Sequence, residues 1–175
     1  MDIDYINLKY DEEGLYSLSH KQEADKLSYI IKDKYSDIGI MDATSGIGGN
    51  SISFGFNFSH VISVEQNPKR FEMLKINIES RKLNNILLYG NFIDFINMDY
   101  ELIFLDPPWG GPTYKFQKIT SFGINDMSLR EVSGLLKSKG KIVVWKLPFN
   151  YDLSEFKIFN YEIYRLKNYL ILIIE

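Results

Sequence analysis

Short apolar runs and longer stretches with helical spacing alternate along the chain. The short runs lie between polar or glycine-containing segments and therefore predict buried strands. They cover residues 38–43, 61–65, 86–89, 102–105 and 141–146. The longer stretches place apolar residues three or four positions apart, which predicts helices packed against a core. They cover residues 20–34, 47–56, 68–82 and 128–138.

Local signals mark the ends of several of these helices. Ser19-His20-Lys21-Gln22 matches a capping box with Ser19 as the N-cap. Pro68 suits the first turn of a helix, and Gly140 ends the last predicted helix. A short helix is expected after Gly90-Asn91-Phe92, whereas residues 1–18 and 113–125 are expected to be mostly irregular.

Strands that alternate with helices predict a doubly wound α/β fold with a mainly parallel sheet and right-handed crossovers. Two further strand-like runs, residues 156–164 and 168–174, close the chain with no long helix between them. We therefore expect an antiparallel C-terminal β-hairpin and a seven-stranded sheet in all. Residues 1–175 form a single domain in this interpretation, with an N-terminal segment and helix at 1–36 and the sheet core at 37–175.

The composition is that of a globular protein, because 45% of the 175 residues are hydrophobic and 25% are charged. No apolar run approaches the length that a membrane-spanning helix needs, and the first residues lack the basic and apolar regions of a signal peptide. The absence of cysteine excludes disulfides and thiolate chemistry. We expect an intracellular, cytoplasmic protein, with the nucleus as the alternative.

The net charge of −3 argues against nucleic-acid binding through bulk electrostatic attraction. A nucleic-acid substrate would have to be held by a local basic patch or by stacking. The two histidines, His20 and His60, lie far apart in the sequence, so we expect no metal site.

A glycine-rich turn, Ser45-Gly46-Ile47-Gly48-Gly49-Asn50, lies between the first predicted strand and its helix. Glycines let the backbone pass close to a ligand, and a helix amino terminus presents N–H groups. The pattern matches neither the dinucleotide fingerprint nor the P-loop. Asp42 before the turn would repel a pyrophosphate but suits a ligand with an ammonium or sulfonium group. The alternative is a tight turn that binds nothing.

Polar residues also follow the next two predicted strands. Glu65 has two carboxylate oxygens that can accept from both hydroxyls of a ribose, although a solvated surface acid is the alternative. Asn91 and Phe92 offer an amide and an apolar wall to a purine. Together with the turn, these residues fit S-adenosylmethionine. The expected cofactor-binding residues are Asp42, Ala43, Gly46, Gly48 and Asn50 at the methionine end, Glu65 at the ribose, and Asn91 and Phe92 at the adenine.

The apolar run 102–105 leads into Asp106-Pro107-Pro108-Trp109-Gly110-Gly111-Pro112. The prolines fix φ and remove backbone donors, so the chain turns stiffly after the strand. A large aromatic side chain is thereby held near a carboxylate at the carboxyl end of a strand, where ligands bind in open α/β sheets. The alternative is an ordinary proline-rich turn whose Trp109 fills the edge of the core.

With this motif the chain resembles the class I S-adenosylmethionine-dependent methyltransferases that modify exocyclic amines. The longer string from Leu105 to Pro112, followed by Tyr114, resembles the trimethylguanosine synthase family of RNA cap guanine-N2 methyltransferases. Residues 13–17, 46–50 and 147–150 agree with this resemblance. It implies a Rossmann-like methyltransferase fold for the single domain.

The resemblance also implies methyl transfer to the exocyclic N2 of a 7-methylguanosine cap, with capped RNA as the partner and S-adenosylmethionine as the cofactor. Asp106 and Pro107 are then the catalytic residues, because they accept from the amine and orient its lone pair. Stacking of Trp109 on the methylated purine adds a cation–π contact of about 2 kcal/mol. The expected substrate-binding residues are Trp109, Pro108, Tyr114 and Lys146.

Some positions depart from the family pattern. Asn91 stands where the family usually has an acid. Phe149 stands where an arginine usually contacts the cap phosphates, so Lys146, Lys115 or Lys118 would have to replace it. Family members also carry more chain before the core. We expect either a minimal enzyme or one that depends on a protein partner for the missing cap-binding elements.

Two other functions stay open. One is an amino-methyltransferase acting on adenine or guanine in DNA or ribosomal RNA, against which the sequence Gly110-Gly111-Pro112 and the lack of a separate target-recognition segment argue. The other is a non-catalytic cap-binding or assembly subunit that retains the fold. The intact acids Asp42, Glu65 and Asp106 argue against that subunit.

Overall fold

The computed structural model describes residues 7–109, 116 and 120–175. The chain forms two compact units, Met1–Glu101 and Leu102–Glu175. The single domain over residues 1–175 stays a prediction. No helix within the described ranges is both long and apolar enough to cross a lipid bilayer.

Parallel strands form the centre of the first unit. They are β1 (Ile40–Asp42), β2 (Val61–Glu65) and β3 (Ile86–Tyr89), in the order β3-β2-β1. Ile40 is paired with Val61, and both β1 and β2 are buried along their whole length. Because the strands are parallel, their carboxyl ends at Asp42, Glu65 and Tyr89 lie along one edge.

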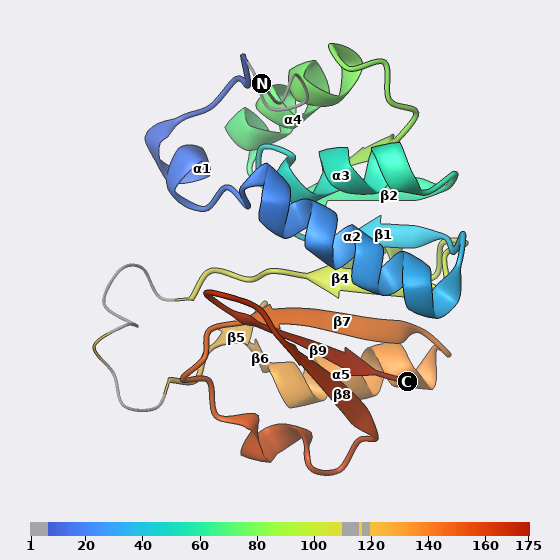
Figure 1. Ribbon diagram of the computed structural model, residues 1–175, viewed down its shortest axis with the longest axis vertical. Helices are drawn as coiled ribbons and strands as arrows, with labels where there is room; N and C mark the ends of the chain where they lie inside the picture. Colours follow the sequence, from blue (N-terminus) through green and yellow to red (C-terminus); the bar gives the residue numbers. More distant parts are fainter. Residues whose placement is uncertain (1–6, 110–115, 117–119) are drawn as a thin grey trace. The chain divides into compact units, whose positions relative to one another are not determined.

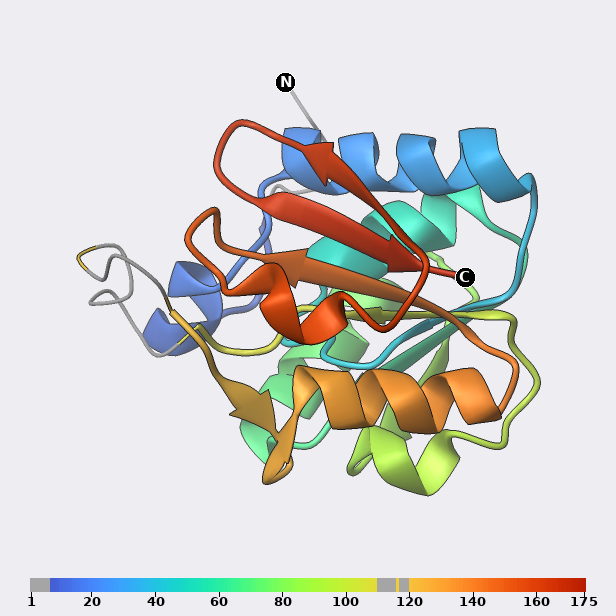
Figure 2. The same ribbon diagram turned by 90° about the horizontal axis from the view of Figure 1, so that it is seen from below.

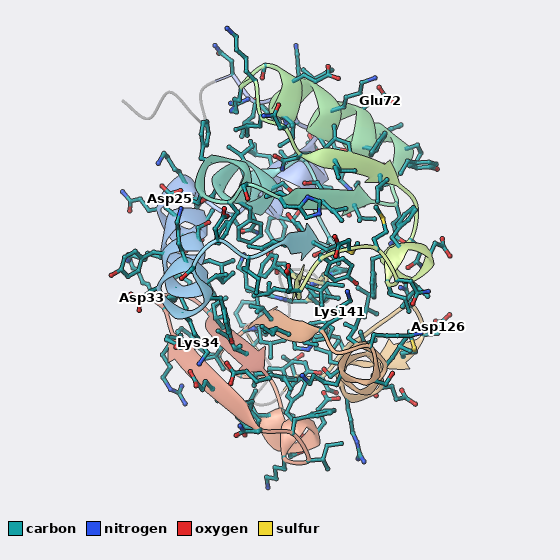
Figure 3. All side chains as sticks on the ribbon, turned by 90° about the vertical axis from the view of Figure 1, so that its right-hand side faces the viewer. Asp25, Asp33, Lys34, Glu72, Asp126 and Lys141 are labelled. Carbon is teal, nitrogen blue, oxygen red and sulfur yellow. The ribbon has the colours of Figure 1, made fainter. Side chains whose placement is uncertain are left out.

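Helices flank these strands (Figure 1). They are α1 (Glu12–Tyr16), α2 (Lys21–Tyr35), α3 (Gly49–Asn57), α4 (Pro68–Glu79) and the 3-10 helix η2 (Phe92–Phe95). α2 runs alongside α3, where the buried hydroxyls of Ser28 and Ser53 lie 2.8 Å apart. Ile52 of α3 packs with Leu74 of α4 in the core. Charged side chains such as Glu72 lie on the outer side of the helices (Figure 3).

The second unit contains the C-terminal hairpin. Its strands are β4 (Leu102–Leu105), β7 (Ile142–Leu147), β9 (Leu170–Ile174) and β8 (Tyr161–Arg165), side by side in that order. β4 and β7 are parallel, whereas β9 is antiparallel to both β7 and β8 (Figure 2). The unit also contains β5 (Gly123–Ile124), β6 (Met127–Ser128), α5 (Leu129–Ser138) and η4 (Leu153–Phe156). α5 packs against β7, where the Trp145 indole donates to Ser133 Oγ at 2.9 Å.

The predicted fold class is confirmed. Seven strands form a mainly parallel sheet with an antiparallel hairpin at the carboxyl end of the chain. The strands at residues 61–65, 86–89 and 102–105 have the predicted bounds. Each of them is an apolar run with polar or glycine-containing segments on both sides, so the pattern alone places its ends.

Two predictions near the amino terminus are wrong. The capping box at Ser19 does not form, because Ser19 is buried and accepts from Asn50 instead, which leaves His20 as the N-cap of α2. Residues 12–16, which the sequence predicts to be irregular, form α1. Asp11 caps this helix by accepting from the Gly14 N–H at 2.7 Å.

Two predictions in the second unit are also wrong. Residues 123–124 belong to the short antiparallel hairpin of β5 and β6, although the sequence predicts an irregular segment there. Asn125 and Asp126, with φ of 53° and 60°, make the tight turn of this hairpin. The strand predicted from Phe156 begins only at Tyr161, because Phe156 is buried as the last residue of η4.

Candidate active site

Asp42 ends β1 and holds the glycine-rich turn in shape. The residue is only 1% exposed. Its Oδ2 accepts from the Ser51 hydroxyl at 2.5 Å, and its Oδ1 accepts from the Thr44 N–H at 3.3 Å. The buried carboxylate is therefore bonded to donors from the turn and from α3, so it fixes the path of the chain between β1 and α3.

Gly46 and Gly48 give the turn a path that other residues rarely adopt, with φ of 56° and 108°. A Cβ placed on Gly46 would meet no atom within 4 Å, so there is open space beside the backbone here. Gly48 is the N-cap of α3, and the N–H groups of a first helical turn favour an anionic group. Ala43 is buried just before the turn. These features suit a small ligand that carries a carboxylate.

Glu65 ends β2 and is buried at 7% exposure, which excludes the alternative of a solvated surface acid. Its Oε2 accepts from the Gly46 N–H at 2.8 Å, and its Oε1 accepts from the Asn67 N–H at 2.7 Å. Arg70 lies between two acids, with Nε 3.7 Å from Glu65 Oε1 and Nη1 2.8 Å from Glu13 Oε1. Each carboxylate oxygen can accept a further hydrogen bond, so Glu65 is ordered and still able to bind hydroxyl groups.

The segment before α2 lies against the glycine-rich turn. A Cβ on Gly14 would come within 2.6 Å of Ile47 Cγ2, and a Cβ on Gly49 would come within 3.0 Å of the Ser19 carbonyl oxygen. Asn50, which the sequence assigns to the cofactor, donates from Nδ2 to Ser19 Oγ at 3.0 Å. Asn50 therefore joins this segment to α3.

Asn77 of α4 completes this attachment, and the sequence analysis does not identify it. Its buried amide accepts from the Lys9 N–H at 2.7 Å. The same amide donates to the carbonyl oxygens of Lys9 and Ile47, at 2.9 Å and 2.8 Å. Asn77 and Arg70 are two helical turns apart, so they share a face of α4, but their partners lie too far away in the sequence for a local pattern to reveal them.

Asn91 and Phe92 follow β3, as predicted. The Asn91 side chain caps η2 by accepting from the Ile93 N–H at 3.1 Å. Phe92 is 3% exposed, so the protein itself covers nearly all of its ring. This burial gives Phe92 a place in the core that the sequence interpretation does not include, and its contact with an adenine stays a prediction.

Asp106 follows β4 and forms a buried ion pair with Lys146 of β7. The Lys146 Nζ lies 2.7 Å from Asp106 Oδ2, and the two side chains are 8% and 14% exposed. The ammonium also lies over the rings of Trp109 and Tyr169, at 5.6 Å and 4.9 Å from their centroids. An enclosed ammonium with these contacts organises the carboxylate and the aromatic ring. It is not displayed at the surface, where a substrate phosphate would meet it.

Trp109 is half-buried and anchored at one edge. Its indole N–H donates to the Lys146 carbonyl oxygen at 3.3 Å. Pro107 is buried and Pro108 is exposed. Trp109 does not fill a closed core, because part of its surface reaches solvent, and this suits a stacking platform. Tyr114 lies outside the described residues.

The segment after β7 contains the position at which the family pattern has an arginine. Phe149 occupies this position and is 47% exposed, so the segment offers an aromatic surface and not a charge. The Thr120 N–H donates to the Asn150 carbonyl oxygen at 2.8 Å and so fixes the segment. The next residue, Tyr151, donates its hydroxyl to Glu155, and burial together with this contact raises the pKa of Tyr151.

The predicted site residues fall into two groups, one in each unit. The predicted cofactor-binding residues all belong to the first unit, where Asp42, Glu65 and Asn91 follow or end successive parallel strands. The predicted catalytic and substrate-binding residues belong to the second unit, where Asp106 and Lys146 are joined directly. Each group contains a carboxylate that other residues of the protein hold in place, and its contacts with a ligand stay predictions.

The family described as RNA cap guanine-N2 methyltransferase matches residues 38–173. This chain belongs to that family. The match begins shortly before β1 and ends within β9, so it includes both groups of site residues. The resemblance drawn from Asp106-Pro107-Pro108-Trp109 and its neighbours is confirmed.

One of the similar proteins carries a name that agrees with the family. The trimethylguanosine synthase of Schizosaccharomyces pombe is 31% identical over 157 residues, which cover 83% of this chain and 64% of that protein. An uncharacterized protein of Acanthamoeba polyphaga mimivirus is 32% identical over 139 residues, which cover 75% of this chain and 52% of that protein. The chain therefore spans between about half and two thirds of the length of these relatives.

Solved structures share the fold of the family member described here. A hypothetical protein of Thermus thermophilus has a TM-score of 0.72 at 16% identity, covering 98% of this chain and 94% of that one. The 16S rRNA N2 G1207 methyltransferase of T. thermophilus, solved with AdoMet and guanosine, has a TM-score of 0.66 at 14% identity, covering 98% and 44%. At these identities the likeness concerns the fold alone.

Replacement of Asn77 by alanine tests the attachment of the N-terminal segment. Asn77→Ala removes three hydrogen bonds to backbone groups, one of them buried and two partly buried. We expect the free energy of unfolding in urea to fall by about 2 to 3 kcal/mol. The control is Asn84→Ala, at an exposed position between α4 and β3. This variant should change the free energy of unfolding by less than about 0.5 kcal/mol. Equal stability of the two variants would contradict this role of Asn77.

Proposed function

We propose that the chain is an S-adenosylmethionine-dependent methyltransferase that acts on the exocyclic N2 of a 7-methylguanosine RNA cap. The observation that carries the proposal is the Asp-Pro-Pro-Trp motif at the end of β4, with a paired carboxylate and a half-buried tryptophan, inside the family match. The first unit then binds the methyl donor and the second unit binds the amine.

The residues of the first unit fit the proposed cofactor. The open space beside Gly46 and the first turn of α3 suit the amino-acid end of the molecule. Glu65 accepts from the ribose hydroxyls through the lone pairs that Gly46 and Asn67 leave unused. When bound, S-adenosylmethionine supplies a methyl group on a positively charged sulfur, which takes the carbon–sulfur electron pair as the methyl leaves.

The residues of the second unit would orient the attacking amine. The lone pair of a guanine N2 is conjugated with the ring, so its direction decides the rate. The Asp106 carboxylate and the Pro107 carbonyl oxygen accept the two N–H groups and turn the lone pair toward the methyl group. Most of the acceleration then comes from positioning, and little basicity is required. The nitrogen loses one proton as the new bond forms, and Asp106 is the acceptor beside it.

Trp109 is the proposed platform for the methylated base. Its ring is anchored through the indole N–H to Lys146, so it loses little freedom when a base stacks on it. Capped RNA is the proposed substrate. Among the described residues, the ion-paired Lys146 and the exposed Phe149 do not supply the phosphate contact of the family pattern, and Lys115 and Lys118 lie outside the described ranges. We propose that a protein partner provides this contact.

Transfer of label from S-adenosylmethionine to a 7-methylguanosine cap analogue tests the function. We expect a product methylated at N2, identified by mass and by comparison with authentic N2,7-dimethylguanosine. Unmethylated cap, adenine in DNA and guanine in ribosomal RNA serve as competing acceptors. Faster transfer to any of these would replace the cap assignment. No binding of millimolar S-adenosylmethionine in calorimetry would instead identify a non-catalytic subunit.

Glu65→Gln tests the proposed ribose contact. The amide keeps the shape of the side chain but replaces one acceptor oxygen by a donor, which faces the N–H group of Gly46 or of Asn67. We expect the Kd for S-adenosylmethionine in calorimetry to rise by about 10- to 100-fold. The matched control is Glu72→Gln on the outer side of α4 (Figure 3), with unchanged affinity. Equal affinities for the two variants would place the ribose elsewhere.

Trp109→Ala tests the platform. Loss of stacking should raise the KM for the cap analogue by about 10- to 50-fold, because an aromatic–base contact contributes on the order of 2 kcal/mol. Binding of S-adenosylmethionine should stay unchanged. Tyr29→Ala, which removes an exposed aromatic ring from α2, is the control and should leave KM as it is. If Trp109→Ala has the KM of the wild type, the alternative holds, in which Trp109 only fills the edge of the core.

A further inference from the structure

Lys146 connects every described side chain that the proposed amine site uses. Its ammonium is 2.7 Å from Asp106 Oδ2, and little solvent reaches either group. The same ammonium lies 5.6 Å from the centroid of the Trp109 ring, and the Lys146 carbonyl oxygen accepts from the Trp109 indole. The ring of Tyr169, itself buried, covers the ammonium at 4.9 Å. One residue of β7 thus holds the carboxylate, the platform and a fixed positive charge.

The fixed charge of Lys146 affects how strongly the site distinguishes 7-methylguanine from guanine. A 7-methylguanine carries a positive charge, whereas guanine is neutral. An unpaired carboxylate beside the platform would attract the charged base more strongly than the neutral one. The ammonium opposes this attraction, because it is bonded to the carboxylate and lies 5.6 Å from the centroid of the Trp109 ring. The low exposure of the pair limits screening by salt.

We propose that Lys146 is a specificity-determining residue of the amine site. By neutralising Asp106 it confines the preference for 7-methylguanine to stacking on Trp109, so that neutral guanine is also accepted as a ligand. This inference rests on the proposed function, since it concerns the same site and the same base.

The test compares affinities for 7-methylguanosine triphosphate and guanosine triphosphate in the full chain. Each Kd is measured by titration, and the ratio of the two is the readout. Damage to the site as a whole weakens the binding of both nucleotides by the same factor, and this factor cancels in the ratio. The variants are Lys146→Met, Asp106→Asn, the combination of both, and Lys146→Arg as the charge-retaining control.

The two single variants should move the preference for the methylated base in opposite directions. Lys146→Met removes the ammonium from beside the Asp106 carboxylate and should raise the preference on the order of fivefold. Asp106→Asn removes the negative charge from beside the Lys146 ammonium and should lower the preference by a similar factor. The combined variant should return within about twofold of wild type, as should Lys146→Arg.

The outcomes separate the inference from the function it rests on. If both single variants bind the two nucleotides with the wild-type ratio, or if both shift it in the same direction, Lys146 has only a structural role and the inference is wrong. If Lys146→Met does not fold, Asp106→Asn alone tests the inference, through the predicted fall in its preference for the methylated base. If the wild-type chain binds neither nucleotide, the proposed function fails, and the inference fails with it.

Discussion

A carboxylate buried at the end of a strand needs hydrogen-bond donors, and this requirement organises both units of the chain. Asp42 is satisfied by the Ser51 hydroxyl, Glu65 by two backbone N–H groups, and Asp106 by the Lys146 ammonium. In each case the donor comes from an element that must then sit close to the strand end. The acids therefore shape their own surroundings before any ligand arrives, which reduces the reorganisation that binding requires.

Much of the fold could be predicted from the sequence, because apolar runs bounded by polar residues mark the strands. The position of Glu65 at the end of β2 and that of Asp106 after β4 follow from the same pattern. The sequence does not reveal whether a polar side chain is available to a ligand or is bonded to another residue of the protein. Lys146 is one of three lysines that the sequence offers to the phosphates, and in the structure it is paired with Asp106. Asn50 is a predicted cofactor residue, and its side chain is bonded to Ser19. Such pairings join residues far apart in the chain, and no local spacing encodes them.

The departures from the family pattern have a common electrostatic character. The surface position expected to carry a cation holds Phe149, while the cation of Lys146 lies enclosed beneath Trp109. The positive charge of Lys146 therefore acts on the Asp106 carboxylate and the Trp109 ring. The net charge of −3 gives the chain little general attraction for a polyanion such as RNA. Recognition of the base and recognition of the phosphates are consequently separate problems for this protein. The described residues address the first of them.

Gly14 and Gly49 have a consequence for how this protein can vary. Each is pressed so closely by a neighbour that a methyl group in its place would collide with Ile47 or with the backbone at Ser19. The glycine-rich turn therefore has an inner side that faces its own N-terminal segment, in addition to the open side at Gly46. A larger residue at Gly14 or Gly49 would therefore require a change in the surface that it meets. Two stretches of sequence about thirty positions apart therefore depend on each other for their packing.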